Sequence, residues 1–269
     1  DADIAGRLPQ ASGRTRQVLV ELVGRRRIEA ALPALVRSAS DADAGVRGAA
    51  VAAIGAIGSA EHLPDLVKVL ATTQDRKERA GVEKALVAIS SRGGAACAQP
   101  LMPLAKSGDG ALRAIALHAL AAAGGTDALA AVKAALGDKD QAVQHEAVRT
   151  LSTWPNKWSE DDGVVEPLLA LVKSSTKLQH QVLGLRGYLQ YLHGTKKLGD
   201  ADKQARLNDV LPLIKRPEEK RLAISVLGTV RTAAALDRLV AYAGEAVVAE
   251  EACTAIVGLA GRRDLKGAS

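Results

Sequence analysis

The chain has 269 residues, of which 48% are hydrophobic and 25% are charged, and its formal net charge is +6. No apolar run approaches the roughly 18–20 residues that a membrane-spanning helix needs, and no signal peptide is visible, so we expect no membrane span. Phe is absent and only two Trp and three Tyr are present, so Ala, Leu and Val must build the core.

One helical segment returns along the whole chain. Its first clear copy, residues 46–57, reads VRGAAVAAIGAI. With Ile54 as the reference, the matching residues are Leu22, Ile54, Leu86, Leu120, Leu151, Tyr188, Leu227 and Ile256. The gaps between them are 32, 32, 34, 31, 37, 39 and 29 residues. This period is typical of a solenoid, in which each helical pair buries its apolar face by stacking on its neighbours.

Each repeat is predicted to consist of a helix A, a short turn and a helix B. In the first repeat, helix A is truncated to residues 4–9. In the later helices A, apolar residues recur at the spacing of a single buried stripe. In chain order these stripes are Leu32, Leu35 and Val36; Leu63, Leu66, Val67 and Leu70; Leu129, Val132 and Leu136; Val165, Leu168, Leu169 and Val172; Leu207, Val210, Leu211 and Ile214; and Leu236, Leu239 and Val240. The polar residues 262–269 are expected to end the array.

The turns before three of the helices B share an Asp-x-x-x-Arg motif. The pairs are Asp43 with Arg47, Asp75 with Arg79, and Asp109 with Arg113. An Asp at the start of a helix accepts hydrogen bonds from the free N–H groups there. The Arg one turn later is expected to pair with this Asp or with an Asp of the adjacent repeat. The motif therefore predicts a structural ladder between repeats.

Two insertions interrupt the period, at residues 154–163 and 193–200. Insertions in repeat proteins map to loops on one face, often the face that binds a partner. The array is treated as one domain, residues 1–269, with the first insertion marking a break or hinge.

The few large aromatic residues are predicted to have different roles. Trp154 aligns with Ile57, an apolar position, and Tyr188 and Tyr191 also align with core positions. Trp158 lies within the first insertion and is the best candidate for an exposed contact.

The two cysteines, Cys97 and Cys253, lie about five repeats apart. At roughly 10 Å per helical layer they are too distant for a disulfide, and both are expected to be buried small apolar residues. The cysteines therefore do not identify the cellular compartment, which is the cytoplasm or, if a leader was removed, the periplasm or the cell exterior.

The Asp-x-x-x-Arg turn, the Ala-rich helix that follows it and the period together resemble HEAT and HEAT-like repeats, including the short form of bilin-lyase-type proteins. The resemblance covers residues 12–261. It implies an all-α, right-handed α-α superhelix of armadillo type with seven to eight helical pairs, whose helices B line the concave face. The later repeats depart from the pattern, with Gln179, Lys220 and Ala249 at the Arg position. Residues 186–222 resemble HEAT arrays attached to larger bacterial proteins.

Motifs that carry catalytic chemistry are missing from the sequence. There is no Walker A, H-E-x-x-H, C-x-x-C or G-x-S-x-G motif. The dipeptide His145-Glu146 resembles the pairs with which a HEAT-repeat hydroxylase family holds two irons, but one pair cannot build that centre. We therefore expect no catalytic residue, no metal ion and no cofactor.

Two positions of helix B, those of Gly48 and Ala52, should share a face beside the buried stripe. The first carries Gly48, Ala80, Ala114, His145, His180, Arg221 and Glu250, and the second Ala52, Lys84, His118, Arg149, Arg186, Ser225 and Thr254. Stacking would align the seven His, Lys and Arg residues among them into a basic ribbon; the alternative is an ordinary solvated helix face. With the loop Trp included, the predicted contacts are Lys84, His118, His145, Arg149, Trp158, His180, Arg186 and Arg221.

The sequence thus predicts a non-catalytic scaffold or adaptor that binds an acidic or extended protein segment on its concave face. We expect a monomer or one module of a multidomain chain. One alternative is a nucleic-acid-binding array that resembles HEAT-like DNA glycosylases, although its basic residues should then be concentrated on one face, and here they are evenly spread. A second alternative is an accessory domain of a larger bacterial enzyme.

Overall fold

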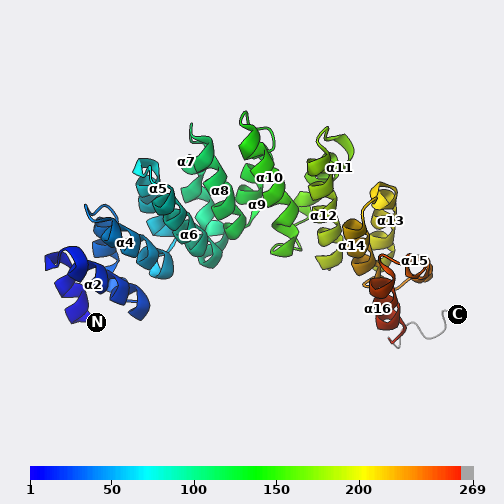
Figure 1. The fold of residues 1–269 in the computed structure, drawn as a ribbon, viewed down its shortest axis with the longest axis horizontal. Helices are drawn as coiled ribbons and strands as arrows, with labels where there is room; N and C mark the ends of the chain where they lie inside the picture. Colours follow the sequence, from blue (N-terminus) through cyan, green and yellow to red (C-terminus); the bar gives the residue numbers. More distant parts are fainter. Residues whose placement is uncertain (262–269) are drawn as a thin grey trace. The chain divides into compact units, whose positions relative to one another are not determined.

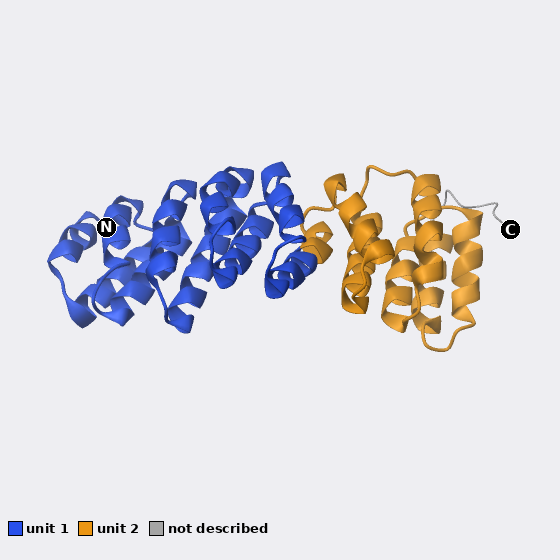
Figure 2. Cartoon of the chain, turned by 90° about the horizontal axis from the view of Figure 1, so that it is seen from above, with its two compact units in different colours: residues 1–150 blue, residues 151–269 orange. Residues whose placement is uncertain are grey.

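The computed structural model describes residues 1–261, and no β-strand occurs among them. The predicted end of the array, residues 262–269, lies outside the described residues. The chain divides into two compact units, residues 1–150 and 151–269 (Figure 2). The unit boundary falls just before the insertion at residues 154–163.

Unit 1 consists of helical pairs that follow one another along the sequence (Figure 1). Its elements are α1 (Ala2–Arg7), η1 (Leu8–Gln10), α2 (Gly13–Arg26), η2 (Glu29–Ala31), α3 (Leu32–Ser38), α4 (Ala44–Ile57), η3 (Ala60–His62), α5 (Leu63–Thr72), α6 (Arg76–Gly93), η4 (Gly94–Cys97), α7 (Ala98–Ala105), α8 (Gly110–Ala123), α9 (Thr126–Ala135) and most of α10 (Gln141–Thr153). Helices B contact helices B (α2 with α4, α4 with α6, α6 with α8) and helices A contact helices A (α5 with α7, α7 with α9). Unit 1 is therefore built in two layers.

Unit 2 continues the alternation of helices A and B. Its elements are η5 (Trp154–Asn156), η6 (Asp162–Val164), α11 (Val165–Ser174), α12 (Leu178–Gly194), α13 (Asp200–Val210), η7 (Leu211–Leu213), α14 (Pro217–Leu227), α15 (Ala233–Ala243) and α16 (Ala249–Ala260). From α1/α2 to α15/α16 the described residues hold eight pairs, which confirms the predicted all-α solenoid of seven to eight pairs.

The Asp residues of the repeated turn cap the helices B. Asp43 Oδ1 accepts hydrogen bonds from the Gly45 and Val46 amides at 2.7 and 3.1 Å, and Asp75 accepts one from the Glu78 amide at 2.9 Å. Asp109 accepts one from the Ala111 amide at 2.8 Å. These caps satisfy donors that the first helical turn leaves free.

The Arg residues of the turn connect each repeat to the next. Arg113 donates to the Ser107 carbonyl of its own turn at 2.8 Å and to both oxygens of Asp138, in the next turn, at 2.7 and 2.8 Å. The Arg113 guanidinium holds the pKa of Asp138 below its usual range, and the Asp140 amide adds to the effect. Arg79 likewise pairs with Asp109 of the next repeat at 3.5 Å. The predicted ladder is confirmed for these repeats.

Small residues set the distance between neighbouring helices B. A Cβ on Gly55 would lie 2.8 Å from the Ala85 Cα, and a Cβ on Gly24 would lie 3.0 Å from the Ala53 Cβ. The same positions of the repeat face each other in unit 2, where a Cβ on Gly228 would lie 3.4 Å from the Ala255 Cβ. In each pair a glycine of one helix B lies against an alanine of the next.

These contacts correct the predicted register in two places. In α2, Gly24 takes the place of Gly55, so the buried Val23 and not Leu22 matches Ile54. In α12, Gln181 donates to the Ser175 carbonyl six residues earlier, as Arg113 does to Ser107, so Gln181 and not Gln179 stands at the Arg position. His180 then occupies the core position of Val46, and both are buried.

The two insertions pack against each other within unit 2. The Lys196 amide donates to Glu160 at 3.0 Å, Lys197 pairs with Asp162 at 3.6 Å, and a Cβ on Gly194 would lie 2.8 Å from the Ser159 Cβ. The insertions therefore form one feature, and neither of them is an independent loop.

The predicted core aromatics are buried, and the cysteines differ from each other. Trp154, Tyr188 and Tyr191 are each no more than 2% exposed, as expected, and the Trp154 indole donates to Asp161 at 3.0 Å. Cys97 is buried as predicted, whereas the prediction for Cys253 was wrong: it is exposed, because α16 is the last helix B of the described chain.

The contact between Gly55 and Ala85 predicts the effect of a single methyl group. Gly55→Ala should lower the free energy of unfolding by about 1–2 kcal/mol, because the clash with the α6 backbone outweighs the gain in helix propensity. Gly48 in the same helix is the matched control, since a Cβ there meets nothing within 4 Å, and Gly48→Ala should raise stability by about 0.5–1 kcal/mol. Thermal unfolding followed by circular dichroism measures both; a loss for Gly48→Ala as large as that for Gly55→Ala would contradict this packing.

Candidate partner-binding surface

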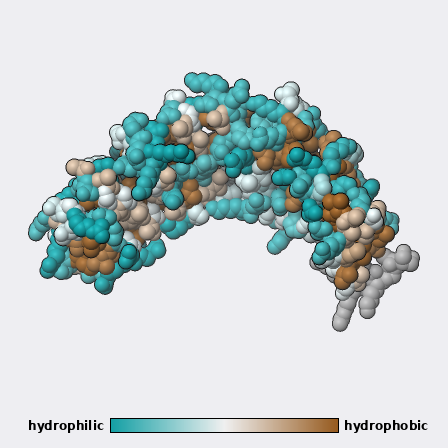
Figure 3. All heavy atoms as spheres, in the orientation of Figure 1, coloured by the Kyte–Doolittle hydropathy of each residue, from teal (hydrophilic) through white to brown (hydrophobic). Residues whose placement is uncertain are grey.

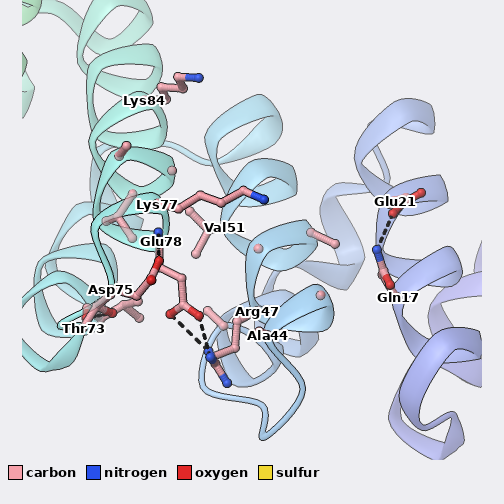
Figure 4. Close-up of a pocket in the computed structure, with 18 residues that line it drawn as sticks. Gln17, Glu21, Ala44, Arg47, Val51, Thr73, Asp75, Lys77, Glu78 and Lys84 are labelled. Atoms are coloured by element: carbon pink, nitrogen blue, oxygen red, sulfur yellow. Dashed lines mark hydrogen bonds and ion pairs between the residues drawn. The ribbon is translucent and has the colours of Figure 1, made fainter.

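A hollow of about 650 Å³ opens between the helices B of unit 1 (Figure 4). It is lined mainly by residues of α2, α4 and α6, with Ala39, Val69 and Thr73 from the layer of helices A, and its floor includes Gly48, Ala80 and Gly81. A Cβ on Gly48 or on Gly81 would meet nothing within 4 Å, so these two positions leave the helix backbone open to an approaching chain.

Two lysines of α6 supply the unpaired positive charge at this hollow. Lys77 and Lys84 are both exposed, and neither makes a hydrogen bond or ion pair with any residue in the described range 1–261. They lie seven residues apart, which is close to two helical turns, so they share one face of α6 with Gly81 between them. Figure 4 shows the Lys77 side chain reaching from α6 over Val51 of α4.

The other charged residues around the hollow are already engaged. Arg47 donates to both Glu78 oxygens at 2.5 and 3.3 Å and to the Asp41 carbonyl at 2.8 Å. Glu21 accepts a hydrogen bond from Gln17 at 3.0 Å. Glu21 and Asp75 accept hydrogen bonds from uncharged donors and keep their negative charges, so the two lysines are the cations of the hollow that have no acidic partner among residues 1–261.

A second hollow of about 440 Å³ lies along the same face of α6. It is lined by Ala80, Glu83, Lys84, Val87, Ala88 and Ser91. Ala80 and Lys84 line both hollows, so the two are contiguous along α6. Of the predicted contact residues, Lys84 is the one that lines these hollows.

His118 on α8 connects three successive helices B. Its Nδ1 lies 2.6 Å from Glu83 of α6, and its Nε2 lies 2.9 Å from Glu146 of α10. Burial disfavours protonation of the ring, but the hydrogen bonds with Glu146 and Glu83 outweigh it and raise the pKa of His118. A protonated His118 between two carboxylates contributes no free positive charge to the surface.

The remaining predicted contacts of unit 1 lie on α10, where His145 is half-buried and Arg149 is exposed. In unit 2, Arg186 donates to the buried Glu219 at 2.7 Å, and Arg221 donates to Glu251 at 2.6 Å. His180 is buried and so does not lie on the exposed face. Trp158 is half-buried, with the Lys157 amine 5.1 Å from its ring centre.

Lys77 was missed by sequence reasoning. The basic ribbon was defined by two positions per repeat, those of Gly48 and Ala52. Lys77 lies one turn before the first of them, at the position of Gly45. Its distance of seven residues from Lys84 was the available signal, because residues two turns apart share a helix face.

Other kinds of site were also sought in the structure. Within residues 1–261 there is no group of three or more His, Cys, Asp or Glu residues that could hold a metal ion. Over the same residues, no helix combines the length and the hydrophobicity that crossing a membrane requires.

A family described as HEAT repeats matches residues 5–87 and 98–182, more than half of the chain. The chain belongs to the HEAT-repeat family. No curated protein matches it.

Several solved structures resemble this HEAT-repeat protein in fold. An engineered protein is 20% identical, with a TM-score of 0.46 over 96% of this chain and 78% of its own. A HEAT-like repeat protein from the archaeon Thermococcus onnurineus is 13% identical, with a TM-score of 0.43 over 96% of both chains. The complex of CpcE and CpcF of phycocyanin lyase from Nostoc is 18% identical, with a TM-score of 0.41 over 97% of this chain and 93% of that one. These similarities concern the fold alone.

The bridge at His118 predicts a pH-dependent contribution to stability. Because the folded-state pKa is raised above the unfolded value of about 6.5, the bridge should stabilise the fold fully below that pH and lose this contribution as pH rises through the folded pKa. The difference in thermal midpoint between the wild type and His118→Gln should therefore be largest near pH 6 and shrink at alkaline pH.

NMR titration of the His118 ring provides the direct measurement. Glu83→Gln and Glu146→Gln should each lower its pKa, whereas His193→Gln in unit 2 should leave it unchanged. A ring pKa at or below that of a free histidine in the wild type would show that the bridge does not form.

Proposed function

We propose that the protein is a non-catalytic scaffold whose unit 1 binds an extended, acidic protein segment along α6. The observation that carries this proposal is the pair of unpaired lysines, Lys77 and Lys84, above a floor of glycine and alanine. A floor without side chains lets a partner backbone lie close to the helix, and the lysines supply the charge that would select a carboxylate-bearing segment.

The spacing of the lysines defines the segment further. Two helical turns separate their Cα atoms by about 10 Å. A chain in the extended polyproline-II conformation has three residues per turn and rises about 3.1 Å per residue, so carboxylates three residues apart lie on one face at about this separation. A segment of the form Glu-x-x-Glu, with small or polar residues between the acids, therefore suits the two hollows along α6.

Only some residues of the predicted basic ribbon are retained in this proposal. Lys84 keeps its role, and Lys77 joins it. His118, Arg186 and Arg221 each pair with a carboxylate of a neighbouring helix, and His180 is buried. Arg149 and the half-buried His145 and Trp158 remain proposed contacts of a longer partner.

Charge reversal at the two lysines tests the proposal. Lys77→Glu combined with Lys84→Glu should weaken binding of a fluorescent peptide with Glu at every third position by about tenfold, as expected when two exposed ion pairs become repulsive. Lys133→Glu on α9 is the matched control, because it makes the same charge change at an exposed lysine outside the two hollows. Fluorescence anisotropy of the labelled peptide gives the dissociation constants.

Two results would overturn the proposal. One is equal affinity of the double variant and the control for the peptide. The other is tighter binding of a DNA or RNA oligonucleotide of matched charge, with affinity falling steeply as salt rises, which would favour the nucleic-acid alternative.

A further inference from the structure

The C-terminal end of the described solenoid exposes an apolar stripe on α16. Cys253, Ile256, Val257 and Ala260 follow the i, i+3, i+4, i+7 spacing of one helix face. Val257 is 71% exposed, Cys253 and Ala260 are exposed, and Ile256 is half-buried. This stripe contains large apolar residues that a solenoid normally covers.

The same positions are covered in the preceding helices B. The residues that match Ile256 are Ile54, Leu86, Leu120, Leu151, Tyr188 and Leu227, and all are buried. The residues that match Cys253 include Val51, Leu117, Leu185 and Ile224, also buried. Those that match Val257 include Gly55 and Gly228, which lie against the next helix B. The stripe of α16 is thus a stacking surface of the array without its neighbour among the described residues.

The N-terminal end presents the complementary side of the same interface. On α2, Val18 is 46% exposed and Leu22 is half-buried. By the corrected register Leu22 matches Ala53 and Ala85, the residues that receive Gly24 and Gly55. Figure 3 shows hydrophobic atoms at the surface over α2 at one end and over α15 and α16 at the other.

We propose that two copies of this chain associate head to tail, with α16 of one copy stacked on α2 of the next. In the register of the other interfaces, Val257 would lie against Leu22. A pair of large residues fits there, because Leu189 and Val226, which occupy the same two positions in α12 and α14, are both buried. The contact continues an interface that the fold already builds repeatedly, and it is heterologous because two different surfaces meet.

Charge at the two ends supports a second copy as the occupant. Arg221, at the position of Gly48, pairs with Glu251, which is at the position of Ala49 in the next helix B. These two positions of successive repeats therefore lie side by side. Glu250 of α16 occupies the position of Gly48, and Val18 of α2 occupies that of Ala49, so the two would lie side by side in the proposed contact. The exposed Arg14 lies one turn from Val18 on the same face of α2. Opposite charges therefore flank the apolar contact.

Sedimentation velocity of the 269-residue chain over a range from about 1 µM to about 1 mM tests this, since a single small interface is expected to be weak. The weight-average mass should rise above that of the monomer with concentration. Val257→Glu should abolish the rise. Leu178→Glu on α12 is the matched control, because Leu178 is 67% exposed and lies outside both ends; it should associate as the wild type does.

A charge swap identifies the two surfaces that meet. Glu250→Arg and Arg14→Glu should each weaken association, and the double variant should restore it. A constant monomer mass over the whole range, equal effects of Val257→Glu and Leu178→Glu, or no rescue by the double variant would overturn the proposal. Circular dichroism confirms that each variant is folded.

Discussion

The close approach of neighbouring helices B is the constraint on which the rest of the structure depends. Where Gly55 meets Ala85, or Gly24 meets Ala53, no side chain larger than a methyl group separates the two backbones. Because each repeat contacts only the next one, the residues at these two positions determine the spacing of each pair of helices B separately. A chain without Phe suits such packing, since bulky rings would force the helices apart.

The short distance between helices B also determines how the charges of the exposed face behave. His118 reaches carboxylates on both neighbouring helices, and Arg221 reaches one. Exposed ion pairs of this kind contribute little stability, but they occupy charges that would otherwise attract a partner. Lys77 and Lys84 differ because the residues around them are small, or, like Glu83, are already bound to another side chain. The two lysines of α6 therefore remain unpaired because the residues around them offer no acidic side chain that pairs with them.

A linear architecture has a further consequence at its ends. Every stacking interface joins two different faces of the repeat, so an array necessarily begins with one of these faces and ends with the other. Terminal repeats of solenoids are often made polar on their outer side. Here Val18 and Leu22 of α2 and Val257 of α16 retain the apolar character of interior positions, and the proposed head-to-tail contact rests on this.

The sequence by itself determined the fold class, the number of helical pairs, the Asp caps and the buried aromatics. These features follow from local spacing: the period of the anchor residues, the Asp four residues before an Arg, and the apolar positions of Trp154, Tyr188 and Tyr191. Each is a pattern of residues either a few turns apart or one repeat apart, and such patterns are visible in a linear chain.

Only the tertiary structure decided which charges are free, which register each helix adopts and how the insertions are arranged. His180 was aligned two residues away from its true position, although it lies eight residues before Tyr188 as Val46 lies eight before Ile54, and the Gln181 contact with the Ser175 carbonyl confirms that register. His118 was taken for a free cation because Glu83 and Glu146 are 35 and 28 residues away along the chain. A charge is neutralised by whatever lies within a few ångströms, and proximity across repeats is created by stacking.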